Sequence, residues 1–411
     1  MAKHLADNKI ISARQHGFLK DRSAADLHLL MNSKWAKALD EGLQTLVLAI
    51  DIEGAFDRVW YEGLLAKLQS IGFSGKLLDL LKDDLSGRTL KVVLGGSDSS
   101  SYPIRAGVPQ GSILGPLLWC VHFNDALNML PESDAYADDL TLSTTCHPKN
   151  LHLAARKFSE RLKLLSRWGE LWQANFAIDK TQLMVIWRSP VQVPIRFGDS
   201  WIVNADEIDI LGVIYDKKLS FQRHIISISK KAAGKLTALR RITWLVETHE
   251  MEILYKSQIR STMEFAPLCW GGAAPTHLEL LNKVQRRAER LMYGDVEESP
   301  LTSLQQRRDV AGLTALYKIQ VLGAEHLRSL RLPQRPVPRV TRAAVADVTR
   351  RALQEPRCNT LHYQLQFTPK YCKLWNTFVT TMPENQLRNS FKTSQCFKSA
   401  VHIWLNHINT H

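Results

Sequence analysis

The chain has 411 residues, of which 45% are hydrophobic, so it is long enough for more than one hydrophobic core. Its formal net charge of +13 favours a polyanionic partner, either nucleic acid or an anionic surface. No apolar run approaches the ~18 residues of a membrane-spanning helix, and no secretory segment opens the chain. Six scattered cysteines without a C-x-x-C pair indicate neither a zinc module nor a disulfide scaffold. We expect an intracellular protein of the nucleus, the cytoplasm or both, without a membrane partner.

A buried strand is the first strong prediction along the chain. Residues 43–52 form a near-continuous apolar run rich in β-forming residues, as in a strand that is buried on both faces. Asp51 lies near the end of this run, where a charge is costly unless it is paired or bound to a metal ion. Asp51 is therefore a candidate metal ligand.

A loop rich in glycine and proline follows two predicted helices and a predicted strand over residues 89–94. Residues 107–116 read Gly-Val-Pro-Gln-Gly-Ser-Ile-Leu-Gly-Pro and lead into an apolar helix. Gly111 permits a close approach of the backbone to a ligand, and Gln110 offers an amide beside it. The alternative interpretation is an ordinary helix N-terminus with a Gly/Pro turn.

Two adjacent aspartates then stand between two short runs that predict strands. Tyr136-Ala137-Asp138-Asp139 is the expected tip of a hairpin, because Leu140 and the residues after it alternate between apolar and polar. Two crowded carboxylates repel each other and favour a hard divalent ion with oxygen ligands, Mg²⁺ above all. Taken alone, such a pair most often marks only a solvated turn.

Mixed helices and strands continue to about residue 220, which favours an α+β fold over a doubly wound one. An amphipathic helix is predicted over residues 151–174, and a strand over residues 182–187 follows Lys180. Lys180 is either an exposed turn lysine or a cation aimed at a phosphate. Residues 201–215 predict a pair of short strands, with Leu211 and Gly212 in the second.

The remainder of the chain predicts helices with two basic patches. Charge runs are usually solvated faces, but successive basic helices also suit a phosphate backbone. Residues 328–351 carry seven arginines against one acid and predict a basic linker before a small helical end region. The basic patches contain Lys230, Lys231, Lys235, Arg240, Arg241, Lys283, Arg286, Arg287 and Arg290.

Asp51 and the pair Asp138-Asp139 together supply three carboxylates around one point. Such a set can hold two Mg²⁺ ions about 3.5–4 Å apart, which serve an in-line displacement at phosphorus. Nucleotidyl transfer needs little else than positioning, charge neutralisation and a proton donor for pyrophosphate.

These motifs, in this order, resemble the reverse transcriptases of non-LTR (LINE-type, jockey-like) retrotransposons. The match comprises Asp51 followed by Ala-Phe-Asp, the loop over residues 107–116, Tyr-Ala-Asp-Asp, Lys180-Thr and Leu211-Gly. Gln15-His-Gly-Phe with Arg22-Ser is similar to the last motif of the family's fingers. A four-residue match arises by chance at well under ~1% in a chain of this length, and an ordered set is far rarer.

The resemblance implies a role for each matching position. Phe56 would be the steric gate that excludes a 2′-OH and so selects dNTPs, and Lys180 would neutralise or protonate pyrophosphate. Arg22, Gln110 and Gly111 would contact the incoming nucleotide. The metal ligands would be Asp51, Asp138 and Asp139 with the backbone carbonyl of Ile52, and the primer grip would be Leu211 and Gly212. Taken alone, Phe56 would read as a core residue, and Asp57 with Arg58 would read as a local ion pair.

The resemblance also implies an architecture and partners. We expect a right-hand polymerase with partial fingers and palm over residues 1–220, a helical thumb over 221–300 and a C-terminal basic and helical region over 301–411. The partners would be an RNA template, a DNA primer and dNTPs, with two Mg²⁺ ions or with Mn²⁺. We also expect the chain to begin after the first part of the fingers. The alternative function is therefore a catalytically inactive remnant that binds nucleic acid.

Overall fold

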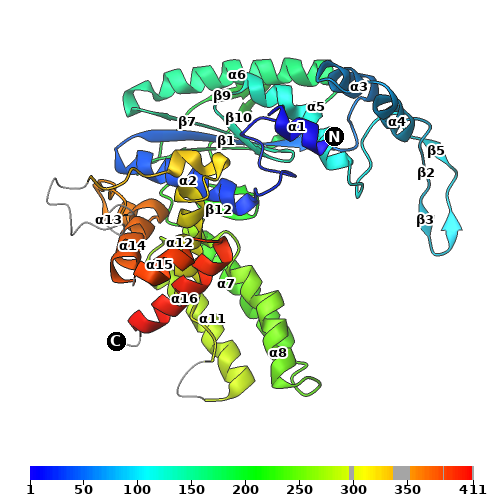
Figure 1. Cartoon of the computed structure of the whole chain (residues 1–411). Coiled ribbons are helices and arrows are strands. Elements are labelled where there is room, and N and C mark those ends of the chain that lie inside the picture. Colours follow the sequence, from blue (N-terminus) through cyan, green and yellow to red (C-terminus); the bar gives the residue numbers. More distant parts are fainter. Residues whose placement is uncertain (296–299, 337–351, 383, 410–411) are drawn as a thin grey trace. The chain divides into compact units, whose positions relative to one another are not determined.

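The structure, a computed structural model, divides most of the chain into two compact units (Figure 1). It describes residues 1–295, 300–336, 352–382 and 384–409. The first unit comprises residues 1–24 and 44–211, and the second comprises residues 25–43 and 212–411. The domain boundaries expected at residues 220 and 300 remain predictions.

A four-stranded antiparallel sheet is the centre of the first unit. Its strand order is β6-β7-β1-β8, so that β1 lies between two partners and β6 forms an edge. The expected α+β class with an antiparallel sheet is confirmed at this level of detail. The strands are β1 (Gln44–Glu53), β6 (Ser133–Tyr136), β7 (Asp139–Cys146) and β8 (Asn175–Ile186).

The predicted apolar strand is β1, and its burial explains its composition. Leu46, Leu48 and Ile50 are at most 2% exposed. Full burial of such a side chain is worth about 1.5–3 kcal/mol, which favours the central place in the sheet. Two helices pack against the sheet and supply large core side chains such as Trp119 and Phe158. These helices are α5 (Gly115–Met129) and α6 (Leu151–Trp172), and α6 agrees with the predicted amphipathic helix.

Shorter elements complete the first unit. The continuous strand predicted over residues 89–94 is wrong: two strands of two residues each occur there, separated by Lys91 and Val92. Val93 and Leu94 are exposed, so no core holds this segment in one extended strand. These elements are α1 (Ala2–Asp7), α3 (Tyr61–Ser70), α4 (Lys76–Leu85), β2 (Thr89–Leu90), β3 (Val93–Leu94), β4 (Ser97–Asp98), β5 (Tyr102–Pro103), η1 (Pro148–Asn150), β9 (Ile195–Phe197), β10 (Ser200–Ile202) and β11 (Glu207–Ile210).

The second unit is mainly helical. Helices α7 and α11 pack along each other, while α12 packs against α14 and α16 (Figure 1). Its elements are α2 (Ala24–Asp40), β12 (Val213–Asp216), α7 (Gln222–Arg240), α8 (Thr248–Leu254), the π-helix η2 (Tyr255–Arg260), α9 (Ser261–Met263), α10 (Pro267–Trp270), α11 (Pro275–Tyr293), α12 (Leu304–Gln320), η3 (Glu325–Leu330), α13 (Leu361–Gln364), α14 (Phe367–Thr381), α15 (Glu384–Ser390) and α16 (Ser394–Asn409). Residues 337–351 of the predicted basic linker lie outside the described residues.

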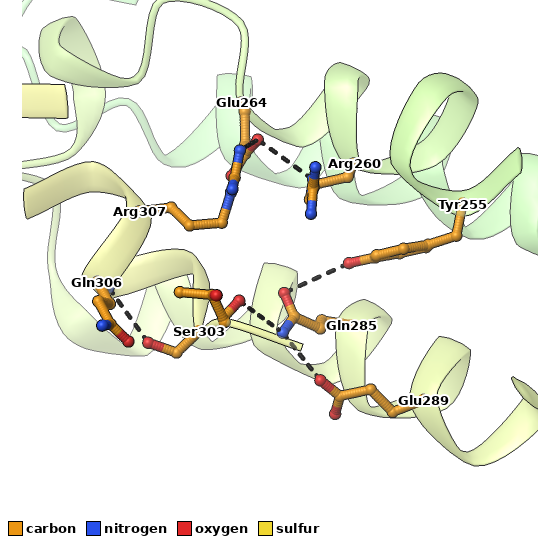
Figure 2. Close-up of polar contacts among 9 residues, drawn as sticks. Tyr255, Arg260, Glu264, Gln285, Glu289, Ser303, Gln306 and Arg307 are labelled. Carbon is orange, nitrogen blue, oxygen red and sulfur yellow. Dashed lines mark hydrogen bonds and ion pairs between the residues drawn. The ribbon is translucent and has the colours of Figure 1, made fainter. Parts of the chain in front are cut away.

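A polar network joins η2, α11 and α12 (Figure 2). The Tyr255 hydroxyl donates to the side-chain oxygen of Gln285 at 3.3 Å, and the Gln285 amide donates to Glu289 at 2.9 Å. Arg307 of α12 forms a two-pronged contact with Glu264, with Nη2 2.9 Å from Oε2. Because buried polar groups are costly unless paired, this network fixes how the helices pack.

Within the residues that the structure describes, no helix is both long enough and apolar enough to cross a membrane.

Candidate functional site

The Tyr136–Asp139 segment is a tight hairpin, as predicted. β6 and β7 pair in antiparallel register, with Tyr136 opposite Asp139, so Ala137 and Asp138 form a two-residue turn. Ala137 has φ of +59°, a left-handed conformation that costs a non-glycine residue energy. The turn presents Asp138, and β7 begins with Asp139.

A bulge in β8 brings Lys180 to Asp51. Ala49 of β1 pairs with Gln182 of β8, whereas Asp51 pairs with Ala177, so four residues of β8 stand opposite one residue of β1. This bulge contains Lys180, whose Nζ lies 3.3 Å from Asp51 Oδ2. The hydroxyl of Thr181 donates to the carbonyl of Ala177 at 3.0 Å and closes the bulge.

A cleft of about 490 Å³ lies at this end of the sheet, within the first unit. Its lining contains the two carboxylates expected from β1 and β7, together with two further acids and one lysine. It is lined by Ala49, Ile50, Asp51, Asp139, Leu140, Thr141, Asp179, Lys180, Gln182, Asp209, Ile210 and Leu211. The cleft therefore joins residues from four separate parts of the sequence.

Clustered carboxylates raise one another's proton affinity at this cleft. Partial burial, followed by the charges of Asp138, Asp51 and Asp209, raises the pKa of Asp139 to about 6. The pKa of Asp138 is also raised, first by burial and then by the charge of Asp51. A cation relieves such repulsion, so the electrostatics of the cleft favour binding of a positive ion.

The donor set suits a hard divalent cation, because carboxylate oxygens are the ligands that such ions prefer. In the described ranges, no three histidine, cysteine or acidic side chains already stand in a metal-binding arrangement. Asp51 is paired with Lys180 instead. Asp51, Asp138 and Asp139 are thus the residues that would hold an ion, and the ammonium group of Lys180 competes with it.

Phe56 lies outside the lining of the cleft and contacts two aromatic rings. Its ring stacks on Trp119 with centroids 5.8 Å apart, and it meets Phe18 edge-on at 5.9 Å. Such pairs restrict the orientation of a ring. Phe56 is half-buried, so it is partly a core residue and still presents a surface.

The loop that carries Gln110 and Gly111 is attached to the segment after Asp51. Gln110 Nε2 donates to Asp57 Oδ1 at 3.1 Å, and the amide of Val108 donates to the carbonyl of Phe56 at 2.7 Å. Gly111 has φ of +84°, a backbone conformation that favours glycine. These contacts tie the loop to the segment that contains Phe56.

Two further expected site residues occupy other places. The guanidinium of Arg22 donates to the carbonyls of Ala13, at 2.7 Å, and Gln15, and burial lowers its pKa. It therefore braces the N-terminal segment. The side chain of Ile52 is buried at 3% exposure, and its role as a carbonyl ligand remains a prediction.

Leu211 and Gly212 form a turn. The prediction that they lie within a strand is wrong, because β11 ends at Ile210 and β12 begins at Val213. Both have positive φ, +49° and +81°, which interrupts an extended strand. Leu211 lines the cleft, and the first compact unit ends there.

Sequence reasoning missed two acidic residues. Asp179 and Asp209 line the cleft, and the charge of Asp209 contributes to the raised pKa of Asp139. The position of Asp209 in a short alternating strand was the available signal. Asp57 was expected to pair with Arg58, but that prediction is wrong: Asp57 accepts from Gln110, and Arg58 pairs with Glu53 at 3.1 Å.

A second candidate site lies on the second unit. Helices α7 and α11 flank a groove of about 460 Å³ that carries three arginines and no acid in its lining. Of the groove arginines, Arg290 pairs with Asp295 at 3.2 Å. Outside the groove, Lys235 donates to the carbonyl of Gln258, and Arg286 pairs with Glu279. The groove is lined by Ala233, Leu236, Thr237, Arg240, Arg287, Arg290 and Leu291.

Comparison with known proteins identifies the class to which this fold and cleft belong. The chain belongs to the reverse transcriptase (RNA-dependent DNA polymerase) family, whose model matches residues 1–215. The matched range contains all the residues that line the cleft.

The similar curated proteins are enzymes of non-LTR mobile elements. The chain is 29% identical over 303 residues to the RNA-directed DNA polymerase from mobile element jockey of Drosophila melanogaster. It is 30% identical over 299 residues to the jockey enzyme of Drosophila funebris. The matches cover 70% and 68% of this chain but 32% of each relative, so the chain spans about a third of their length. The expected relationship to LINE-type reverse transcriptases is confirmed.

A solved structure of telomerase from Candida albicans, in complex with a fragment of telomeric RNA, has a TM-score of 0.40 and 13% identity. The match covers 70% of this chain and 54% of that chain, a likeness too weak to bear on function.

Proposed function

We propose that this chain acts as an RNA-directed DNA polymerase, which extends a primer 3′-OH on an RNA template with dNTPs. The proposal rests above all on the convergence of Asp51 and Asp139 at one cleft, with Asp138 beside them and Lys180 in contact with Asp51. Family membership supports the same reaction, because the relatives are named RNA-directed DNA polymerases.

In the proposed reaction, the primer 3′-oxygen forms a bond to the α-phosphorus of the dNTP, and pyrophosphate leaves as the bond to the bridging oxygen breaks. Two divalent ions, Mg²⁺ or in its place Mn²⁺, would supply charge neutralisation when bound. Asp51, Asp138 and Asp139 would hold them, with the carbonyl of Ile52 as a further ligand. Lys180 would donate a proton from Nζ to the departing pyrophosphate.

The neighbouring residues would select and orient the nucleotide. Phe56, in contact with Phe18 and Trp119, would block the space that a 2′-OH needs and so favour dNTPs. Gln110 and Gly111 would contact the incoming nucleotide, and Leu211 with Gly212 would support the primer end. Arg22 would act indirectly through the segment that it braces.

The architecture that fits this function is a polymerase palm with a helical thumb. The sheet of β6, β7, β1 and β8 corresponds to the palm in this proposal, and the paired helices α7 and α11 to part of the thumb. The groove between these helices would bind phosphates of the template–primer duplex, because arginines provide charge and directed donors.

A second candidate function is nucleic-acid binding without synthesis. The arginine-lined groove favours it, because α7 and α11 belong to a different compact unit from the aspartates. Loss of activity at the aspartates would leave such binding intact.

Primer extension on a poly(rA)/oligo(dT) duplex separates these functions. The wild-type chain should incorporate dTTP only when Mg²⁺ or Mn²⁺ is present, and Asp138→Ala should abolish incorporation with unchanged duplex affinity. Asp199→Ala is the matched control, since Asp199 is an exposed acid that pairs with Arg196 outside the cleft. Duplex binding without any incorporation by the wild type would refute the polymerase function of this chain.

A further inference from the structure

The aspartate hairpin is held by a segment far away in sequence, residues 14–17. Residue 15 forms a parallel bridge with Ala135 of β6, with the amide of His16 donating to Ala135 O at 2.7 Å and the amide of Ala135 to Arg14 O at 2.9 Å. β6 is the edge strand of the sheet, so this segment covers its outer side. All these residues belong to the first compact unit.

The side chain of Gln15 forms hydrogen bonds with the backbone of the turn at Ala137. Gln15 Nε2 donates to the carbonyl of Ala137 at 3.0 Å, and the amide of Ala137 donates back to Gln15 Oε1 at 2.9 Å. The same oxygen accepts the amide of Gly17 at 2.8 Å. Gln15 is 1% exposed, so none of these bonds is readily replaced by water.

Ala137, the residue that Gln15 holds through hydrogen bonds, has a strained backbone conformation. Ala137 adopts φ of +59°, which only glycine reaches without steric cost, and it directly precedes Asp138. Gly17 permits the close approach, because a Cβ there would lie 2.2 Å from the amide nitrogen of Ala137. A strained backbone persists only where its surroundings hold it.

We infer that Gln15 is a positioning residue that holds Ala137 in its left-handed conformation and thereby places Asp139 in the lining of the cleft and Asp138 beside it. The inference deepens the proposed function and rests on it where metal binding is concerned. Gln15 touches no reacting atom; it acts through the backbone of the turn. Side chains that orient metal ligands typically change metal affinity about 10- to 100-fold when removed.

The first test compares Gln15→Met with wild type in the full chain. Methionine keeps the length and volume of glutamine but removes all three hydrogen bonds. We expect Mn²⁺ affinity, followed by electron paramagnetic resonance of the free ion, to fall about tenfold. Amide hydrogen exchange at Ala137 should become faster at the same time.

Gln44→Met is the matched control. Gln44 is another buried glutamine of the sheet, 3% exposed, and it pairs with Cys146 at the opposite end of β1 from Asp51. In the described part of the chain its side-chain oxygen accepts no hydrogen bond. This variant should bind Mn²⁺ and exchange the Ala137 amide as wild type does.

A double variant tests the role of strain. Glycine at position 137 adopts the positive φ freely, so Ala137→Gly should restore part of the Mn²⁺ affinity lost in Gln15→Met. Absence of any recovery would contradict the inference that Gln15 offsets this strain. If Gln15→Met does not fold, Gln15→Asn takes its place, because it keeps the amide but is too short to reach both groups of Ala137.

The two readouts separate this inference from the proposed function. Unchanged Ala137 exchange and unchanged Mn²⁺ affinity in the Gln15 variant would overturn the inference. A wild-type chain that binds no Mn²⁺ through Asp139, judged against Asp139→Asn, would refute the metal site. In that case hydrogen exchange at Ala137 still decides whether Gln15 holds the turn.

Discussion

The aspartate cleft of the first unit and the arginine groove of the second have opposite charge and a different construction. The cleft depends on side chains from four parts of the sequence, which one sheet with a bulge and a tight turn brings together. The groove depends on two helices whose exposed faces repeat basic residues. The cleft therefore needs accurate backbone geometry, whereas the groove needs only accumulated charge.

Because of this difference in construction, we expect the two sites to respond differently to substitution. A phosphate-binding surface loses affinity in increments as charges are removed, and it depends strongly on salt. A carboxylate cleft loses its function when one ligand is lost or moved, because an ion needs several ligands at once. Chemistry and nucleic-acid binding should thus be separable within this chain.

The largest graded effect is expected for the groove. The double variant Arg240→Ala with Arg287→Ala removes two candidate phosphate contacts. On the counterion-release slope each contact contributes about fivefold at 0.15 M salt, so duplex affinity should fall about thirtyfold and the salt slope by about two. Fluorescence anisotropy across a salt series measures both. Mn²⁺ binding at the cleft should not change, and a matching loss there would break the separation of the two sites.

Phe56→Val tests nucleotide choice. The smaller side chain leaves room for a 2′-OH, so the preference for dTTP over UTP should fall by about tenfold. Single-nucleotide incorporation with each substrate gives the ratio of kcat/KM values. Leu90→Val, a truncation at an exposed apolar residue of β2, serves as the control. Unchanged selectivity in Phe56→Val would remove the gate assignment.

Lys180→Met should have a smaller effect, raising the Mn²⁺ affinity of the protein while lowering its rate of dTTP incorporation. The pair with Asp51 is partly exposed, so its loss should raise Mn²⁺ affinity of the free protein only about threefold. Incorporation of dTTP should nevertheless fall, because the proton donor for pyrophosphate is gone. An unchanged rate would show that Lys180 serves only as the partner of Asp51.

The smallest expected effect concerns pH and the stability of the metal-free protein. The pKa of Asp139 is raised from 3.8 to about 6 in the folded state, so between these values the folded chain binds more protons than the unfolded chain. Stability therefore falls as pH rises through this window, and the loss persists above it. Asp139→Asn should flatten this part of the Tm–pH curve. An unaltered curve would mean that folding does not raise the pKa of Asp139, by burial or by the charges of the neighbouring carboxylates.

Much of the fold could be predicted because its signals are local. Local sequence patterns alone predicted three of its elements: the apolar run predicted β1, the alternation after Asp139 predicted β7, and the helical spacing over residues 151–172 predicted α6. The two-residue strands near Val93 could not be predicted, because nothing buries that segment. The turn at Leu211 and Gly212 was missed because an apolar pair resembles strand sequence.

The clustering of the carboxylates at the candidate site could be predicted from the sequence, but the contacts that position them could not. Asp51, Asp138 and Asp139 stood out as charges at the ends of predicted strands. The bulge that brings Lys180 to Asp51 depends on pairing between β1 and β8, which local sequence does not encode. The hydrogen bonds between Gln15 and Ala137 join residues 122 positions apart, so they could be found only in the folded structure.

We propose that the aspartate cleft performs the chemistry while the basic groove binds the duplex. The most direct test measures Mg²⁺-dependent dTTP incorporation and duplex affinity in the same preparations of wild type and Asp139→Asn. We predict that Asp139→Asn abolishes incorporation and leaves the dissociation constant of the duplex within about twofold, as expected for ligands that lie outside the phosphate-binding surface. Incorporation by Asp139→Asn at the wild-type rate would contradict the claim.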